Sequence, residues 1–323
     1  MNPSPRAADA SSDIRVLITG AGGYLGRQLA ARLGGFCQVV GIDLRIDPAV
    51  PCDFQIMDIR DPSLTRLLNE KKITHVVHLA AVLKDSGDRQ RDYDIDVNGT
   101  RNVLDACVAA GVRHLTVASS GAAYGYHADN PDWLDEQDPL RGNDVFAYSC
   151  HKRLVEEMLE DYRQRYPALQ QLILRPGTVL GAETRNLITE LFARKRILAI
   201  RGSDSPFVFI WDQDVLAIIA KGVLEESAGI YNLAGDGALT MPVIAGLLGK
   251  PLLVLPAFLL RWGLYVGRGL RLTEYGPDQL DFLRYRPVLS NRRLKEEFGY
   301  VPEKTSEQTF RYYLDHARAR GDL

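Results

Sequence analysis

The 323-residue sequence predicts an α/β fold, in which a doubly wound parallel sheet is followed by a smaller C-terminal domain. Two observations predict this fold. Short apolar and β-branched runs alternate with helical patterns from residue 14 to residue 120, which is the pattern of consecutive βαβ units. A glycine-rich turn also joins the first apolar run to the first helical pattern. In such a sheet, ligands bind at the carboxyl ends of the strands.

The glycine-rich turn lies within residues 14–26, which read IRVLITGAGGYLG. Gly20 is expected to adopt a backbone dihedral that other residues avoid. Gly23 would let the backbone approach a pyrophosphate, and Gly26 would let the following helix pack close to the strand. The helix N-terminus would offer free N–H groups to phosphates. The segment therefore predicts a Rossmann-type dinucleotide site, with an ordinary glycine-rich turn as the alternative where such a motif stands alone.

A carboxylate follows the second apolar run. Asp43 comes directly after residues 39–42 and 17 residues after Gly26. In a dinucleotide fold, an acidic residue at this place accepts hydrogen bonds from the adenosine ribose and repels a 2′-phosphate, which favours NAD over NADP. Arg45 lies nearby and could pair with a 2′-phosphate, so NADP stays open at this point.

Two later stretches carry further candidate contacts for a dinucleotide. Asp58 and Ile59 lie within residues 53–60 and could bind adenine, the first by a hydrogen bond and the second by contact. Helix capping is the alternative role for Asp58. Residues 73–81 are expected to form a central strand whose small final residues leave room for a cofactor. His78, within that strand, is expected to be structural.

A serine, a tyrosine and a lysine suggest the chemistry. Ser119 and Ser120 follow the strand pattern at 114–118, and Tyr148 and Lys152 stand four residues apart on one face of the next helical pattern. When a hydride leaves or joins a carbinol carbon, the hydroxyl proton also moves, and a phenol within hydrogen-bond reach can exchange it. A neighbouring ammonium favours the phenolate form. Ser120 would hold the same oxygen.

The composition argues against other classes of protein. The net charge is −2, which gives no electrostatic case for binding nucleic acid or an anionic membrane. The four cysteines show no metal-ligand spacing and suit reduced thiols, so we expect no metal site and a cytoplasmic location. The longest apolar stretch, residues 252–260, is too short to span a bilayer. Residues 1–12 are expected to be a disordered leader, because they lack the apolar region of a signal peptide.

Together these motifs resemble an extended short-chain dehydrogenase/reductase, in the branch of NAD-dependent epimerases and dehydratases. The resemblance covers about residues 14–320. The motifs that carry it are Thr19–Gly26, Asp58–Asp61, His78–Ala81, Asn98–Thr100, Ser119–Ser120 before Tyr124–Gly125, Tyr148–Lys152 and Arg175–Gly177. They are specific for the family and much less specific for the substrate.

The resemblance implies a role for each matching residue. Tyr148 would be the acid/base, Lys152 would hold the nicotinamide ribose and tune Tyr148, and Ser120 would bind the substrate oxygen. Asn98, a polar residue among the core positions of the helical pattern 94–110, resembles an asparagine that shapes the site or relays a proton. Pro176 falls where a strand-end loop touches the nicotinamide. The residues expected to bind NAD are Gly20, Gly23, Tyr24, Leu25, Gly26, Asp43, Asp58, Ile59, Leu79, Ala80, Ala81, Asn98, Tyr148, Lys152 and Pro176.

Gly121 and Ala122 narrow the reaction. Nucleotide-sugar 4,6-dehydratases carry an Asp-Glu pair at these positions for elimination, so the resemblance argues against that reaction. An epimerase would oxidise a sugar hydroxyl and reduce the opposite face of the keto intermediate with the same NAD. A simple dehydrogenase or reductase would instead exchange its cofactor. A third hypothesis is a non-catalytic dinucleotide-binding subunit, which the intact Ser120, Tyr148 and Lys152 argue against.

The predicted substrate region matches the family only in part. Asn186 and Leu187 resemble a pair that nucleotide-sugar epimerases use near the nucleoside diphosphate, which favours a nucleotide sugar. Residues 207–215 align with Arg-x-Phe-Ile-His-Val-Asp-Asp-Val, but the arginine and histidine positions are Phe207 and Trp211. Losing the guanidinium removes a strong phosphate contact. The candidate replacements are Arg201, Arg284 and Arg286, and the expected substrate residues are Asn186, Trp211 and Arg201.

Residues 251–272 are unusually apolar. Their larger side chains either line a pocket for a lipophilic alcohol or pack in the core of the small domain or at a dimer surface, and packing is the favoured interpretation. These side chains are Leu259, Leu260, Trp262, Leu264, Tyr265 and Val266. Residues 289–300 resemble the family's closing helix and turn, which covers the substrate.

Residues 13–182 and 206–235 are predicted to form the NAD-binding domain, and residues 183–205 and 236–323 the substrate-binding domain, with the chain returning to the sheet between 207 and 232. The resemblance implies a homodimer. We predict an NAD-dependent epimerase or oxidoreductase acting on a secondary hydroxyl of a nucleotide sugar, as a 4-epimerase does. The alternative substrate is a non-nucleotide, lipophilic alcohol used with NAD(P). The expected partner is a small molecule, with no nucleic acid and no membrane span.

Overall fold

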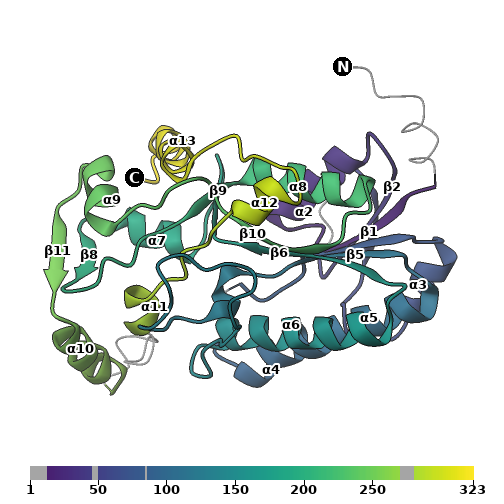
Figure 1. Cartoon of the computed structure of the whole chain (residues 1–323), viewed down its shortest axis with the longest axis horizontal. Helices are drawn as coiled ribbons and strands as arrows, with labels where there is room; N and C mark the ends of the chain where they lie inside the picture. The colour runs from purple at the N-terminus through teal and green to yellow at the C-terminus, as the bar shows by residue number, and fades with distance from the viewer. Residues whose placement is uncertain (1–12, 46–49, 84–85, 270–279) are drawn as a thin grey trace. The chain divides into compact units, whose positions relative to one another are not determined.

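The structure, a computed structural model, describes residues 13–45, 50–83, 86–269 and 280–323 (Figure 1). The predicted leader at 1–12 lies outside the described residues. The chain divides into two compact units. Unit 1 comprises Met1–Ser119, Leu154–Arg175 and Gln213–Tyr231, and unit 2 comprises Ser120–Arg153, Pro176–Asp212 and Asn232–Leu323.

A seven-stranded sheet confirms the predicted doubly wound fold. Its strand order is β10-β6-β5-β4-β1-β2-β3, and the strands from β3 to β6 are mutually parallel. The order reverses between β1 and β4, which is the place where such sheets bind ligands. The strands are β1 (Arg15–Thr19), β2 (Gln38–Asp43), β3 (Asp53–Ile56), β4 (His75–His78), β5 (His114–Ala118), β6 (Gln170–Pro176) and β10 (Gly229–Leu233).

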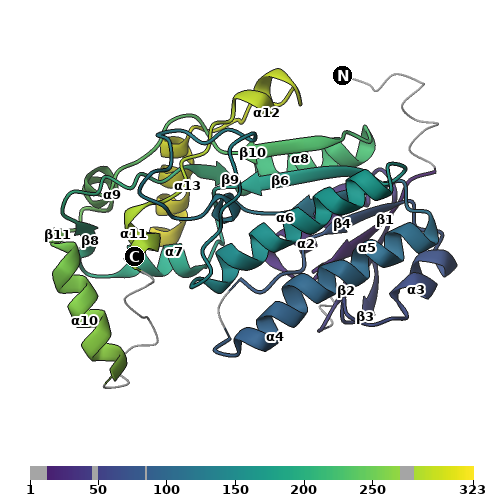
Figure 2. The ribbon, with the colours of Figure 1, turned by 60° about the horizontal axis from the view of Figure 1, so that its bottom comes forward.

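Helices cover both faces of this sheet (Figures 1 and 2). α2 (Tyr24–Leu33) and α8 (Asp212–Leu224) lie on one face, and α3 (Leu64–Glu70), α5 (Gly99–Ala110) and α6 (Ala147–Arg165) lie on the other. The strands are apolar on both faces because both are buried by helices. On the second face, the core joins Leu17, Val76, Leu115 and Ile173 of the strands to Leu67, Leu104 and Leu159 of the helices.

The helix predicted at 94–110 begins earlier and contains an irregular turn. α4 (Arg89–Tyr93) continues into the π-helical turn η1 (Asp94–Asn98), and α5 follows. The extra residue of a π-turn rotates the helix locally, and such turns are frequent at functional sites. As a result Asn98 is exposed rather than facing the core. Its amide donates to Asp94 at 2.9 Å.

Unit 2 contains two parallel strand pairs. β7 (Thr178–Leu180) pairs with β9 (Phe209–Trp211), and β8 (Ile197–Ile200) pairs with β11 (Leu252–Leu255). The predicted return of the chain to the large sheet is therefore made by β10 and not by residues near 207. The other elements of this unit are η2 (Gly121–Tyr124), α7 (Leu187–Ala193), α9 (Met241–Leu248), α10 (Ala257–Gly269), α11 (Leu280–Arg284), α12 (Arg292–Glu296) and α13 (Ser306–Ala319).

The core of unit 2 is built largely from aromatic rings. Phe192 contacts the rings of Phe207, Phe209 and Phe310 with centroid separations of 5.8, 6.2 and 5.2 Å. All four side chains are buried, and each such ring removes a large apolar area from water. In the part of the chain that the structure describes, no helix is both long enough and apolar enough to cross a membrane.

Candidate functional site

The glycine loop of unit 1 has the backbone that the motif predicts. Gly20 has φ of 72°, in the left-handed region that favours glycine. A Cβ on Gly20 would lie 2.9 Å from the Ala80 nitrogen, and one on Gly26 would lie 2.8 Å from the Ala21 Cα. Side chains at these two positions would therefore collide with neighbouring backbone. Glycine allows the loop to pack closely against the end of β4 and the start of α2, and the N-terminus of α2 can then face a pyrophosphate.

Asp43 is fixed beside this loop. Its Oδ2 accepts a hydrogen bond from the Gly22 N–H at 3.0 Å, and its Oδ1 accepts one from the Leu44 N–H at 2.7 Å. A Cβ on Gly22 would come within 3.2 Å of the same carboxylate. The carboxylate is thus held beside the glycine loop, and its contact with a ribose stays a prediction. The side chain of Arg45 is exposed.

The Asp58 carboxylate belongs to a small ionic network on unit 1. It pairs with Arg60 at 2.6 Å, and Arg60 also pairs with Asp94 at 2.7 Å. The Arg60 hydrogen bond is the main reason that the pKa of Asp58 is lowered. Ile59 is buried, and a Cβ on Gly99 would lie 2.6 Å from its Cδ1. The network links the Asp58 segment to the π-turn that carries Asn98.

His78 is a structural residue, as expected. Its Nδ1 lies 2.7 Å from the Thr19 hydroxyl, and its Nε2 lies 3.0 Å from the Thr100 hydroxyl. Because both ring nitrogens are engaged inside the core, the imidazole joins β1, β4 and α5. The Ala80 N–H donates to the Thr19 hydroxyl at 3.2 Å, which keeps the end of β4 against the glycine loop.

The serine, tyrosine and lysine predicted to be catalytic all belong to unit 2. The Ser120 hydroxyl accepts a hydrogen bond from the Ala122 N–H at 3.1 Å and still has a proton to donate to a ligand. Tyr148 is half-buried, and the Lys152 ammonium lies 5.7 Å from the centre of its ring. Ser149 donates to the Ala122 carbonyl at 2.7 Å, so it ties the start of α6 to η2. The structure therefore brings the segments of Ser120 and Tyr148 together.

A buried ion pair in unit 1 adjoins these segments along the chain. Arg175 donates two hydrogen bonds to the Glu156 carboxylate, through Nε at 2.9 Å and Nη2 at 2.6 Å. The Ser119 hydroxyl also donates to this carboxylate. Glu156 follows Lys152 by one helical turn, and Ser119 precedes Ser120, so the ion pair orders the backbone that leads into both predicted catalytic segments. The sequence motif contained Arg175, but its partner was not predicted.

An aromatic row in unit 2 leads from Tyr148 to an arginine. We use this name for the rings of Tyr148, Phe146, Phe282 and Phe207 together with the Arg286 guanidinium. Neighbouring ring centroids are 6.4 Å apart for Tyr148 and Phe146 and 5.5 Å apart for Phe146 and Phe282. Arg286 lies 5.3 Å from the Phe282 centroid and 3.8 Å from the Phe207 centroid. The row thus places a phenol at one end and a cation at the other.

Arg286 is the one of the three candidate arginines that stacks on Phe207. Its Nη1 donates to the Ser205 hydroxyl at 3.2 Å, while its buried Nε has no acceptor among the described residues. Burial lowers the pKa of Arg286 to about 10, so the group stays cationic at neutral pH. A buried donor without a partner favours an added acceptor such as a phosphate oxygen.

Tyr126 lies beside the aromatic row and was not predicted. Its ring is 5.0 Å from Phe282 and 5.6 Å from Phe146. Burial and, to a smaller extent, the nearby Tyr148 raise its pKa, and Arg286 opposes this shift. Tyr126 is therefore neutral at physiological pH. Tyr-Gly-Tyr at 124–126 could have drawn attention to it, but the pairing with Phe282 depends on the fold.

The predicted substrate residues are dispersed over unit 2. Asn186 caps α7 by accepting hydrogen bonds from the Ile188 and Thr189 N–H groups at 3.0 and 2.9 Å. The Lys304 ammonium lies 3.8 Å from the centre of the Trp211 ring. The buried indole nitrogen of Trp211 has no acceptor among the described residues. Arg201 is exposed after β8. The three side chains thus have separate neighbours, and the structure does not bring them together.

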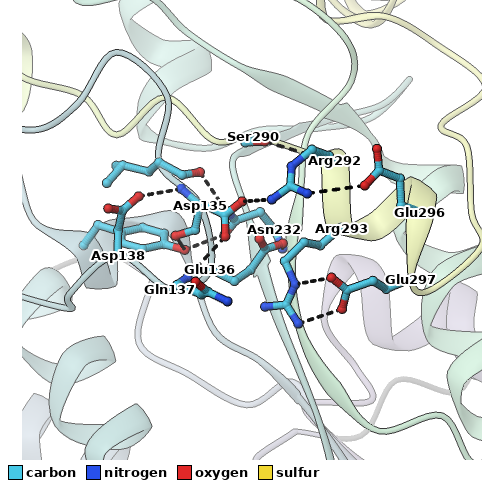
Figure 3. A network of polar contacts seen from close by, with 12 residues as sticks. Asp135, Glu136, Gln137, Asp138, Asn232, Ser290, Arg292, Arg293, Glu296 and Glu297 are labelled. Carbon is cyan, nitrogen blue, oxygen red and sulfur yellow. Dashed lines mark hydrogen bonds and ion pairs between the residues drawn. The ribbon is translucent and has the colours of Figure 1, made fainter.

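The loop after Tyr124 is fastened to the C-terminal tail (Figure 3). Asp135 pairs with Arg292 at 3.0 Å, and the Glu136 carboxylate accepts from the Asn232 N–H at 2.7 Å. The Tyr124 hydroxyl lies 2.9 Å from the Asn232 side-chain oxygen. The Asp135–Arg292 pair holds this loop against the tail segment that the sequence predicts to close over a substrate, while Glu136 and Tyr124 tie the loop to β10.

The tail also occupies the space beside Gly121. A Cβ on Gly121 would lie 2.9 Å from Leu289 Cδ1, and Leu289 is buried. The aspartate that 4,6-dehydratases carry at this position would therefore displace Leu289. That the chain does not perform this elimination stays a prediction from the sequence.

Comparison with known proteins identifies the family. Residues 16–212 match the model described as the NAD dependent epimerase/dehydratase family. The chain belongs to this family. NAD is accordingly the cofactor of this enzyme, and the glycine loop with Asp43 fits it, because the closely packed loop lets the N-terminus of α2 face a pyrophosphate and the carboxylate is held beside the loop.

Individual relatives of this epimerase/dehydratase family member are distant. The UDP-glucose 4-epimerase of Bos taurus is 30% identical over 272 residues, which cover 68% of this chain and 76% of that protein. The N-acetyl-alpha-D-glucosaminyl-diphospho-ditrans,octacis-undecaprenol 4-epimerase of Escherichia coli O157:H7 is 31% identical over 196 residues, 58% of this chain and 57% of that protein. The solved structure of the UDP-glucose 4-epimerase of Thermus thermophilus with NAD is 26% identical, with a TM-score of 0.74, and covers 94% of this chain and 99% of that chain.

Proposed function

We propose that this enzyme is a nucleotide-sugar epimerase that oxidises and then re-reduces one secondary hydroxyl of the sugar, as a 4-epimerase does. The observation that carries the proposal is the aromatic row of unit 2, which runs from Tyr148 to Arg286. A phenol suits a sugar hydroxyl, and a guanidinium suits a diphosphate. The rings between them offer apolar surface to the C–H groups of a sugar.

Each polar residue has a defined task in this proposal. The Tyr148 phenolate would take the hydroxyl proton as the carbinol carbon loses its hydride, and would return that proton when the ketone is reduced. Ser120 would donate a hydrogen bond to the same oxygen. Lys152 would stabilise the phenolate electrostatically. NAD, when bound, accepts the hydride and gives it back. A change of configuration requires the keto sugar to turn its opposite face to the cofactor between the two transfers.

Arg286 would bind the diphosphate in place of the arginine that family members carry at position 207. Its support is the stacking on Phe207 and the buried Nε without an acceptor among the described residues. With its central carbon 3.8 Å from the centre of the Phe207 ring, the guanidinium would offer its in-plane N–H groups to a phosphate.

A second candidate substrate is a sugar diphosphate carried on a lipid, or another lipophilic alcohol. Two observations favour it. One relative is named as a 4-epimerase of a polyprenyl-linked sugar diphosphate. In this chain, α10 exposes the large apolar side chains of Phe258, Trp262 and Tyr265. Two further alternatives remain for the experiment to separate. One is a dehydrogenase that oxidises an alcohol and exchanges its cofactor, and the other is a non-catalytic dinucleotide-binding subunit.

The test begins with purified protein that is denatured and assayed for released nucleotide. Stoichiometric NAD(H), together with interconversion of UDP-glucose and UDP-galactose or of their N-acetyl forms, supports the proposal. Turnover of only the polyprenyl diphosphate sugar supports the second candidate. Net oxidation of an alcohol with cofactor exchange identifies a dehydrogenase, and full biological activity of Tyr148→Phe identifies a non-catalytic subunit. Homodimer formation, which the family resemblance implies, and a cytoplasmic location, which the cysteines suggest, stay predictions.

A further inference from the structure

Helix α10 of unit 2 presents an apolar stripe to solvent. Phe258, Trp262 and Tyr265 are 70%, 68% and 70% exposed and recur at helical spacing. Leu260 and Leu264, on the other side of the helix, are half-buried. Trp262 and Tyr265, two of the side chains for which packing in the core of the small domain or at a dimer surface was favoured, therefore do not pack in the core of unit 2. Packing at a dimer surface stays a prediction. Figure 2 shows α10 leading away from the end of β11.

Aromatic side chains that are this exposed need an explanation. Scattered apolar residues on a surface are normal, but three large rings in one stripe mark an interaction site. Tryptophan and tyrosine are the residues that gather at membrane–water interfaces, because their rings are apolar and their N–H and O–H groups are polar.

The charge around the stripe identifies its partner. In the described stretch 237–269 the charged residues are Lys250, Arg261 and Arg268, with no aspartate or glutamate, although the whole chain carries a net charge of −2. Arg261 is exposed and lies next to the stripe on the helix. Arg201 is also exposed, and its N–H donates to the Leu255 carbonyl at 2.9 Å, directly before α10. The net charge of the whole chain is negative, but the exposed charges named beside the stripe, Arg261 and Arg201, are positive.

We propose that α10 is an interfacial helix that binds the surface of an anionic lipid bilayer. Its apolar stripe would enter the headgroup region while Arg261 and Arg201 contact anionic headgroups. A helix with aromatic residues on one face and basic residues beside them has this property without spanning the bilayer. The inference goes beyond the proposed reaction and does not depend on it.

The test is flotation of the purified full chain with vesicles. One set contains phosphatidylglycerol and phosphatidylcholine, and the other contains phosphatidylcholine alone. We expect the protein to float with the anionic vesicles at low salt and to be released as salt screens the charges. The variant Phe258→Ser/Trp262→Ser should bind at least about tenfold more weakly, because the buried apolar area sets much of the affinity. Arg261→Glu should lose binding to anionic vesicles more than to neutral ones.

Trp133→Ser is the matched control, because Trp133 is also exposed, at 48%, but lies on a loop outside α10. It should bind vesicles like the unaltered chain. All altered residues are exposed, so circular dichroism should show unchanged folding. Equal binding by the control and the α10 variants would overturn the inference, as would no binding to anionic vesicles at low salt. If the unaltered chain is a dimer that ignores vesicles and becomes monomeric in Phe258→Ser/Trp262→Ser, the stripe instead binds a second copy, and the proposal fails.

Discussion

The Arg286 guanidinium lies 3.8 Å from the centre of the Phe207 ring. Phe207 occupies the position where the family segment has arginine, and the cation that stacks on it comes from a residue 79 positions later in the sequence. A cation stacked on a ring away from water gains about 2 kcal/mol. Position 207 thus carries no charge in this chain, but the Arg286 guanidinium lies directly beside it.

Replacing Arg286 should weaken binding of a nucleoside diphosphate. A charged hydrogen bond contributes about 1.5–3 kcal/mol, so Arg286→Met should raise the Kd for UDP by about 10- to 100-fold in calorimetry. Arg201→Met is the control, since Arg201 is an exposed candidate outside the aromatic row. If Arg201→Met loses UDP and Arg286→Met does not, the assignment of the phosphate contact is wrong.

Tyr148→Phe should abolish turnover and keep the cofactor. Removing the proton-exchanging hydroxyl should lower kcat by about 10²- to 10⁴-fold, while the ring and its packing on Phe146 are retained. The NAD content after denaturation should match that of the unaltered enzyme. Tyr166→Phe removes a hydroxyl elsewhere on the chain and should keep full kcat. A kcat for Tyr148→Phe within about twofold of the unaltered value would exclude Tyr148 as the acid/base.

Gly26→Ala should reduce bound NAD. The added methyl group would collide with the Gly20 carbonyl and lie 2.8 Å from Ala21 Cα, so the glycine loop must open. Gly246→Ala is the matched control, because a Cβ there meets no atom within 4 Å and Gly246 lies inside α9. Alanine should stabilise that helix by up to about 1 kcal/mol. The measurement is NAD stoichiometry and Tm for both variants, and equal NAD content would contradict the role of Gly26.

Removing the charge of only one partner of the Glu156–Arg175 ion pair should lower the stability of the protein. Glu156→Gln leaves a buried guanidinium uncompensated, which is expected to cost about 3–5 kcal/mol in urea unfolding. The double variant Glu156→Met/Arg175→Met removes both charges and should be less destabilised than the single variant. A double variant as unstable as the sum of the two single variants would show that the two charges do not act as a pair.

His75 should make the protein less stable in acid. Burial, with smaller effects from His114 and Arg113, lowers the pKa of His75 to about 4. An unfolded histidine has a pKa near ~6.5, so between about pH 6.5 and pH 4 the unfolded chain binds the extra proton and stability falls on acidification. The Glu226 carboxylate lies 3.2 Å from His75 Nε2 and favours the protonated ring, so the total loss is at most about 3 kcal/mol. In urea unfolding from about pH 7 to pH 4.5, His75→Gln should show a flatter pH dependence, and an unchanged slope would exclude His75 as the cause.

Local patterns were enough to predict the parallel sheet and the cofactor loop. The buried run before Gly20 and the carboxylate at Asp43 each depend on a few neighbouring residues, and both lie where predicted. The π-turn at Asp94–Asn98 was not predictable, because it depends on one extra residue in a helical pattern that still reads as continuous. Its effect was to expose Asn98.

The aromatic row depends on long-range packing. Phe146 and Phe282 are far apart in the sequence, and neither belongs to a motif, so only the fold brings their rings to 5.5 Å. Sequence reasoning proposed Arg286 as one of three equal candidates, and the stacking on Phe207 distinguishes it. The exposure of α10 was missed for a related reason, since an apolar helical pattern predicts a buried face but cannot say what covers it.

The contact between Gly121 and Leu289 couples the residues that this chain can carry at these two positions. An aspartate at position 121 would supply an acid for elimination, yet it would have to displace a buried leucine of the tail. Neither change is useful alone: the acid clashes while Leu289 is present, and a smaller residue at 289 leaves a cavity while Gly121 is present. In this chain a larger side chain at position 121 therefore requires a compensating change at position 289, so the two positions are expected to change together.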